Sequence, residues 1–162
     1  MVSNIIETGY LRKGKMEQPG PEEVCDFLKD YGWEYEFDRL RTIHTGWEEH
    51  GNQYGLSIAF HHAFISFEVR DLQRYLKDVP IQDVEDYQVL QRVCSDMIGP
   101  RLDFSYNSIS LLYDIPRKGF CFEQFEIILG CLGHYVDILP NLITQHRQVL
   151  EEGLLGVSYS SH

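Results

Sequence analysis

Histidine and cysteine are the residues of this chain best suited to bind a metal ion or to act in catalysis. The 162-residue sequence contains seven histidines and four cysteines. The candidate metal ligands are His44, His50, His61, His62, His134, His146, Cys121 and Cys131. Neither H-E-x-x-H nor C-x-x-C occurs, and spacings of this kind bring two ligands to one metal ion. We therefore predict no metal site and no bound cofactor.

Nucleophilic catalysis has equally little support in the sequence. There is no G-x-S-x-G motif, and Cys94 and Cys131 lie on apolar helical faces, where core packing is the expected role. Cys121 is expected at a helix N-terminus, which stabilises a thiolate, but an inert position is the simpler interpretation. Acidic pairs such as Glu22 and Glu23 fall at expected helix ends, where the helix dipole favours them. We predict a protein that is not an enzyme.

The composition is that of a soluble, folded protein with an acidic surface. Hydrophobic residues make up 43% of the chain and the formal net charge is -11. Such a charge repels nucleic-acid phosphates and anionic lipids, so we expect neither as a partner. The sequence has no secretory signal and no run of 18 apolar residues, which favours a cytoplasmic location. The scattered cysteines are expected to be reduced there.

The first half of the chain predicts a helix followed by strands. Pro21 suits the first turn of a helix, Val24, Phe27 and Leu28 form its apolar face, and Gly32 suits its end. In the next stretch, residues 33–37, aromatic and acidic residues alternate as in a half-buried strand, and a second short strand is expected through residues 42–47.

The stretch "YGLSIAFHHAFISFEV", residues 54–69, predicts a hairpin with His61-His62 at its turn. That register pairs Ile58 with Ile65 and Leu56 with Phe67 on one apolar face. A two-residue turn prefers Asn-Gly, so a looser loop is the alternative. In either case the position in a turn, not metal binding, accounts for the two histidines.

The second half predicts a helix, a hairpin and a long helix. Asp83 begins the first of these helices and Gly99-Pro100 ends it. Residues 101–116 form a hairpin with Asn107-Ser108 as its turn. The last helix begins near Cys121, and Pro140 must kink or end it. The predicted fold is α+β in the order α-βββ-α-ββ-α, an antiparallel sheet of about five strands with helices on one face. Residues 21–150 form one domain between tails at 1–20 and 151–162. The alternative for residues 1–18 is a strand added to an edge of the sheet.

Three stretches together resemble the YbjN family, whose members are similar in fold to type III secretion chaperones. They are "FLKDYGWEYEFD", the hairpin at 54–69 and "PRKGFCFEQFEIILGCLGHYVDILPNLI". The resemblance covers about residues 21–150. It departs from the family at Cys121, where a Thr or Ser helix cap is usual, and in a longer loop around "RDLQRYLKDVP". It implies a protein-binding or regulatory module, often dimeric, that brings no catalytic residues.

We therefore expect a chaperone-like or regulatory protein that holds a segment of another protein on its sheet or in an apolar groove. Trp47 is a candidate contact for that partner. Tyr87, Leu90 and Val93 form a stripe on the helix from Asp83 that we place at a homodimer interface, with ordinary packing on the sheet as an equal alternative. The alternative to this protein-binding function is a small-ligand or metal-dependent enzyme whose site is assembled from distant His and Cys residues.

Overall fold

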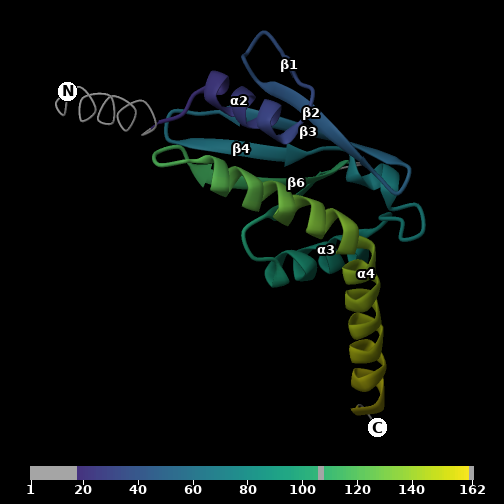
Figure 1. Cartoon of the computed structure of the whole chain (residues 1–162). Helices are drawn as coiled ribbons and strands as arrows, with labels where there is room; N and C mark the ends of the chain where they lie inside the picture. The colour runs from purple at the N-terminus through teal and green to yellow at the C-terminus, as the bar shows by residue number, and fades with distance from the viewer. Residues whose placement is uncertain (1–17, 106–107, 161–162) are drawn as a thin grey trace, which may run out of the picture.

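A computed structural model describes residues 18–105 and 108–160 of the chain (Figure 1). Its centre is one six-stranded antiparallel sheet, in the spatial order β1-β2-β3-β4-β6-β5. The strands are β1 (Glu36–Phe37), β2 (Ile43–Glu49), β3 (Asn52–Phe60), β4 (Phe64–Val69), β5 (Arg101–Ser105) and β6 (Ser108–Pro116). The helices are α2 (Pro21–Tyr31), the 3-10 helix η1 (Leu72–Tyr75), α3 (Val84–Asp96) and α4 (Phe122–Ser160). The α+β class and element order are confirmed, with six strands where about five were expected.

Helix α2 begins and ends where its sequence predicts. Pro21 occupies the first turn, and the backbone N–H of Gly20 donates to a Glu23 carboxylate oxygen at 2.8 Å. Gly32 ends the helix in the left-handed conformation, with φ of 80°, which glycine adopts without steric cost. Val24 and Leu28 are fully buried.

The strand predicted over residues 33–37 is mostly wrong. Only Glu36 and Phe37 pair with β2, opposite His44 and Ile43, and the Phe37 side chain is 45% exposed. The aromatic residues before them pack edge-to-face on other rings instead, Trp33 against Tyr31 and Tyr35 against Phe37. Alternation of aromatic and acidic residues therefore marked a segment that lies beside the sheet rather than one that joins it.

Both predicted hairpins form, each two residues out of the predicted register. Ile58 lies opposite Phe67 and not Ile65, because four residues, 61–64, separate the paired Phe60 and Ile65 where a two-residue turn was predicted. Leu102 lies opposite Leu111 and not Tyr113. Asn107 of the predicted Asn107-Ser108 turn lies outside the described residues. The tail residues 1–17 and 161–162 also lie outside them. A slip of two residues keeps every side chain on its predicted face, so the apolar pattern cannot detect it.

Helix α4 is continuous through Pro140 and bends near its middle (Figure 1). Proline cannot donate the backbone hydrogen bond to the preceding turn, which accounts for a kink rather than an end. The helix extends past the boundary expected at residue 150, and its second half projects from the rest of the molecule. By length and composition alone, residues 122–153 would suffice to cross a membrane. In this fold the first half supplies core side chains, among them Phe125, Ile128 and Leu132.

The core lies between one face of the sheet and the helices. Phe27 of α2 and Phe67 of β4 each lie within about 6 Å of the Phe125 ring, with centroid distances of 5.7 and 6.4 Å. Phe120 and Phe125 are almost fully buried. The other face of the sheet carries small and polar side chains, including Ser57, Ser66, Ser110 and Asp114. This division between an apolar and a polar face is the alternation expected of a sheet with helices on one side.

Asp86 holds α3 against α4. Burial raises its pKa, but backbone N–H groups of Gln82 and Asp83 and the Arg147 guanidinium stabilise the carboxylate and lower its pKa overall. The Asp86–Arg147 distance is 2.9 Å, and both side chains are largely buried. Because the folded-state pKa is lowered, this stabilisation is complete above the unfolded-state pKa near 4 and is lost as pH falls through the folded-state value.

We therefore expect Asp86→Asn to lower the free energy of unfolding by about 1–2 kcal/mol at pH 7. The difference from the wild type should shrink below about pH 4, where the wild-type carboxyl is also protonated. Urea denaturation from pH 3 to pH 7 measures both quantities. An equal deficit at pH 3 and pH 7 would contradict the assignment to the charged form.

Candidate protein-binding groove

A groove of about 1180 Å³ opens at the end of the sheet that carries β1 and β2. Its lining contains two runs of five consecutive residues, Gly32–Glu36 after α2 and His44–Glu48 on β2, together with Gln53, Tyr54 and Gly55 of β3. The two runs lie side by side, and the Thr45 hydroxyl donates a hydrogen bond of 2.6 Å to the Glu34 carbonyl. We call this feature the β2 groove.

Most of the outer edge of β2 faces the β2 groove without a strand partner. In the described part of the chain, β1 pairs with β2 only at Ile43 and His44. Residues Thr45–Glu49 pair with β3 on their inner side alone. On an unpaired strand edge, alternate residues direct their N–H and C=O groups outward, and these groups can pair with an added strand. The groove therefore offers backbone hydrogen bonds to an extended segment.

Two opposed glycines leave a stretch of the groove without side chains. Gly46 and Gly55 lie directly opposite each other in the β2–β3 ladder. A Cβ atom at Gly46 would overlap the carbonyl oxygen of Tyr54, so only glycine fits there, whereas a Cβ atom at Gly55 would enter open space. A glycine inside a strand often marks a place where another backbone approaches closely. At Gly46 the close neighbour is the protein's own chain, and at Gly55 the space is unfilled.

A row of stacked aromatic side chains supports the groove. Trp33 stacks on Trp47 at 5.9 Å and 20°, and Trp47 stacks on Tyr54 at 5.2 Å and 29°. Tyr54 contacts Tyr75 of η1 at 4.5 Å, and the Tyr75 hydroxyl donates to the Gln53 carbonyl. These contacts fix the Gly32–Glu36 segment relative to β2 and β3. Trp47, the residue predicted to contact a partner, is thus half-buried in this row and lines the groove.

The β2 groove is acidic. Its lining includes Glu34, Glu36 and Glu48, all three exposed, and no Lys or Arg. Its single histidine, His44, contacts Asp38 through Nε2 at 2.9 Å. The pKa of Asp38 is lowered, chiefly by this contact with His44 and further by the backbone N–H of Thr42. A carboxylate is therefore retained at Asp38 beside the groove at neutral pH.

His44 also joins Asp38 to Ser57, a combination of side chains that hydrolases use. The Ser57 hydroxyl lies 3.2 Å from His44 Nδ1. Ser57 is 6% exposed and lies on β3, which is paired on both sides, with His44 of β2 and Glu68 of β4. The backbone N–H groups around Ser57 are therefore engaged in the sheet and are not available to an oxyanion. The arrangement anchors the β1–β2 turn to the sheet.

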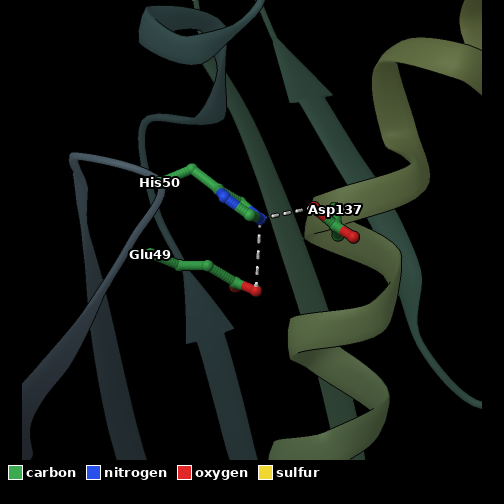
Figure 2. Close-up of side chains that lie close together, drawn as sticks. All are labelled: Glu49, His50 and Asp137. Carbon is green, nitrogen blue, oxygen red and sulfur yellow. Dashed lines mark ion pairs between the residues drawn. The ribbon is translucent and has the colours of Figure 1, made fainter.

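One group of possible metal ligands forms in the described residues. His50 Nε2 lies 3.8 Å from Glu49 Oε1 and 3.7 Å from Asp137 Oδ1 (Figure 2). His50 was among the candidate ligands, and the carboxylates come from the β2 end and from α4. His50 and Asp137 are exposed, so weak ion pairs between the β2–β3 turn and α4 are sufficient to account for the cluster. None of its members lines the β2 groove.

The other candidate ligands lie apart. His61 stacks on Phe64 at 4.2 Å, His146 contacts Asp96 at 2.7 Å, and His134 packs edge-on against Tyr135. Burial raises the pKa of the Cys94 and Cys131 thiols, which favours the neutral, packed form. Cys121 directly precedes α4, and its carbonyl accepts the first helical hydrogen bond, from Phe125.

The proposed stripe on α3 divides between core and surface. Leu90 and Val93 have no exposed area and belong to the core, which fits the alternative that this stripe packs on the sheet. A partner cannot reach these two side chains in this fold. Tyr87 is half-buried and stacks on Phe104 at 5.7 Å. It also lines a smaller pocket of about 360 Å³ with Leu76, Ile81 and Ile109.

Two glycines in the sequence indicate the β2 groove, although the prediction of the strands took no account of them. Gly46 and Gly55 each interrupt a strand pattern, and glycine inside a strand indicates a bulge or a close approach. The two glycines face each other because of the His50-Gly51 turn, whose two residues have φ of 51° and 76°. A two-residue turn with both φ values positive sets the β2–β3 register. Recognising that turn would have brought the glycines together.

Comparison with known proteins identifies the fold. No protein-family model matches the sequence, and no curated protein matches it. Among solved structures, YbjN from E. coli, a proposed transcription regulator, is similar, with a TM-score of 0.51 at 12% identity over 82% of this chain and 94% of that chain. The Yersinia pestis type III secretion chaperone SycH, solved with a fragment of YscM2, has a TM-score of 0.48 at 15% identity over 70% of this chain and 93% of that chain. The chain therefore has a YbjN-like fold, as its sequence patterns predicted.

Proposed function

We propose that this protein is a non-enzymatic, chaperone-like or regulatory module that binds an extended segment of another protein in the β2 groove. The observation that carries the proposal is the edge of β2 at Thr45–Glu49, which no strand of the described residues pairs with and which opens into a groove of about 1180 Å³. A segment added to this edge would gain main-chain hydrogen bonds, as in other cases of strand addition. The stacked aromatic row holds the two walls in place before binding, which reduces the entropy cost of association.

Gly55→Val tests the proposal because it fills the groove without disturbing the sheet. A Cβ atom at Gly55 meets open space, and valine favours strands, so the fold should be retained. We expect random peptides displayed on phage to be enriched by the wild-type protein. Synthetic versions of those peptides should bind Gly55→Val at least tenfold more weakly, with an unchanged thermal melting temperature.

Ile127→Val provides the matched control, since Ile127 is 66% exposed on α4, outside the groove. This variant should bind the enriched peptides as the wild type does. Equal binding by the wild type and Gly55→Val would place the peptide site elsewhere and overturn the proposal. Failure to enrich any peptide would also count against it.

The proposal includes a cytoplasmic location, a homodimer, and neither nucleic acid nor membrane as a partner. Burial of Leu90 and Val93 means that the dimer contact must use other residues than these two. Light scattering on the purified protein measures the native mass, and we expect the mass of two copies. A monomer at all concentrations would remove the dimer from the proposal and leave the groove unaffected.

An enzymatic function is the second candidate, favoured by one observation, the contact of His44 with both Asp38 and Ser57. A fluorophosphonate probe reacts with activated serines, so labelling that disappears in Ser57→Ala would support this alternative. We expect no labelling of Ser57, because it is buried on a central strand whose backbone N–H groups are engaged in the sheet.

A further inference from the structure

We infer that the segment recognised by the β2 groove is basic and extended, with Lys or Arg at alternate positions. This inference rests on the proposed function and adds the chemistry of the partner to it. Its basis is the charge of the groove lining together with the geometry of the strand edge.

The charge of the groove is uncompensated in the described part of the chain. The carboxylates of Glu34, Glu36 and Glu48 form no ion pair or hydrogen bond with any described residue. Neighbouring acids differ in this respect, since Asp38 contacts His44 and Glu49 contacts His50. Three solvated carboxylates around one groove attract a cationic partner and repel an anionic one.

The spacing of the carboxylates matches an extended partner. Glu36 lies opposite His44 in the ladder, and His44, Gly46 and Glu48 project from one face of β2. Alternate side chains of an added strand would project from the same face, about 7 Å apart, and cations there would meet the acidic rim. Between the rims, Gly46 and Gly55 supply no side chains that would exclude the partner backbone.

A helical partner fits this site poorly, since a helix satisfies its own backbone groups and leaves the β2 edge unpaired. A second copy of the chain is also disfavoured. The formal net charge is -11, and joining two such edges would bring two sets of groove carboxylates together. A basic segment from a different protein satisfies both the unpaired backbone and the unpaired charge.

The test uses three blocked eight-residue peptides in which valine alternates with lysine, glutamine or glutamate. Fluorescence anisotropy measures their binding to the full-length protein at low and high NaCl concentration. We expect the lysine peptide to bind on the order of tenfold more tightly than the glutamine peptide, and the glutamate peptide to bind most weakly. The advantage of lysine should shrink in high salt, where exposed charges are screened.

A triple variant, Glu34→Gln, Glu36→Gln and Glu48→Gln, assigns the preference to the groove. It should remove most of the lysine advantage, measured as the ratio of the lysine-peptide affinity to the glutamine-peptide affinity. The matched control changes three exposed glutamates of α4, Glu126, Glu151 and Glu152, to glutamine. Both variants lose three negative charges, so a preference due only to net charge would fall equally in the two.

The outcomes separate this inference from the proposed function. If the glutamine peptide binds wild type but not Gly55→Val, and lysine adds nothing, the groove binds strands without a charge preference and the inference is wrong. If no peptide binds and the protein forms edge-to-edge oligomers that Gly55→Val abolishes, the occupant is a second copy, and the inference is also wrong. If no peptide binds a protein that does not assemble, both the inference and the proposed function fail.

Discussion

Phe125→Ala should lower the free energy of unfolding by about 3–5 kcal/mol, the range for truncating a fully buried phenylalanine. The Phe125 side chain has no exposed area and contacts rings from two other elements, Phe27 and Tyr31 of α2 and Phe67 of β4, and the ring of Phe122 on its own helix. Truncation leaves a cavity where α2, α4 and the sheet meet, and no single element can move to fill it. Urea denaturation followed by circular dichroism measures the loss.

Ile127→Ala on the same helix is the control for this prediction. Ile127 is 66% exposed, so its truncation removes little buried area and should change stability by less than about 0.5 kcal/mol. If the two variants lost similar stability, α4 would not be packed on the sheet through Phe125. That result would contradict the described core and leave the order of the helices and strands unaffected.

Gly46→Ala should cost about 2–3 kcal/mol, although it adds only one methyl group. The new Cβ atom would overlap the Tyr54 carbonyl oxygen, a backbone atom that cannot rotate away as a side chain does. Relief requires the β2–β3 ladder to separate at Gly46 and Gly55, which would also disturb the stacking of Trp47 on Tyr54. Urea denaturation followed by tryptophan fluorescence detects both effects.

Gly55→Ala is the matched control on the opposite strand. Its Cβ atom meets open space and its backbone has no positive φ, so alanine should be neutral or stabilise the fold by about 0.5–1 kcal/mol. The opposite signs expected at two directly paired glycines make this a stringent test of the β2–β3 register. Equal destabilisation by both variants would contradict it.

The fold class could be predicted from the sequence because helix ends and apolar spacing are local properties of the chain. The apolar spacing and end signals of α2, its Gly32 stop and the Asp83 cap of α3 all depend on residues close together in sequence. Asp83 accepts a hydrogen bond from the Asp86 backbone N–H at 3.0 Å, as a helix cap does. Which face of each strand is buried follows from alternation for the same reason.

Register and the groove required information that is not local. Four residues separate the paired Phe60 and Ile65, two more than in a tight turn, which moves Ile58 opposite Phe67, and no apolar pattern records that shift. The stripe on α3 failed as a surface prediction because Leu90 and Val93 look the same in sequence whether they face the core or a partner. The β2 groove arises where the Gly32–Glu36 segment runs beside β2 with little pairing, a tertiary outcome that residues 33–37 do not encode by themselves.

The short pairing of β1 with β2 also bears on self-association of this protein. A strand edge such as Thr45–Glu49, open as far as the described residues go, is a template on which identical chains can polymerise. Charged groups beside such an edge act against self-association, and Glu34, Glu36 and Glu48 occupy that position. Removal of these three charges should therefore favour filaments or aggregates while the core is still folded. Colloidal stability and partner choice would then depend on the same three side chains.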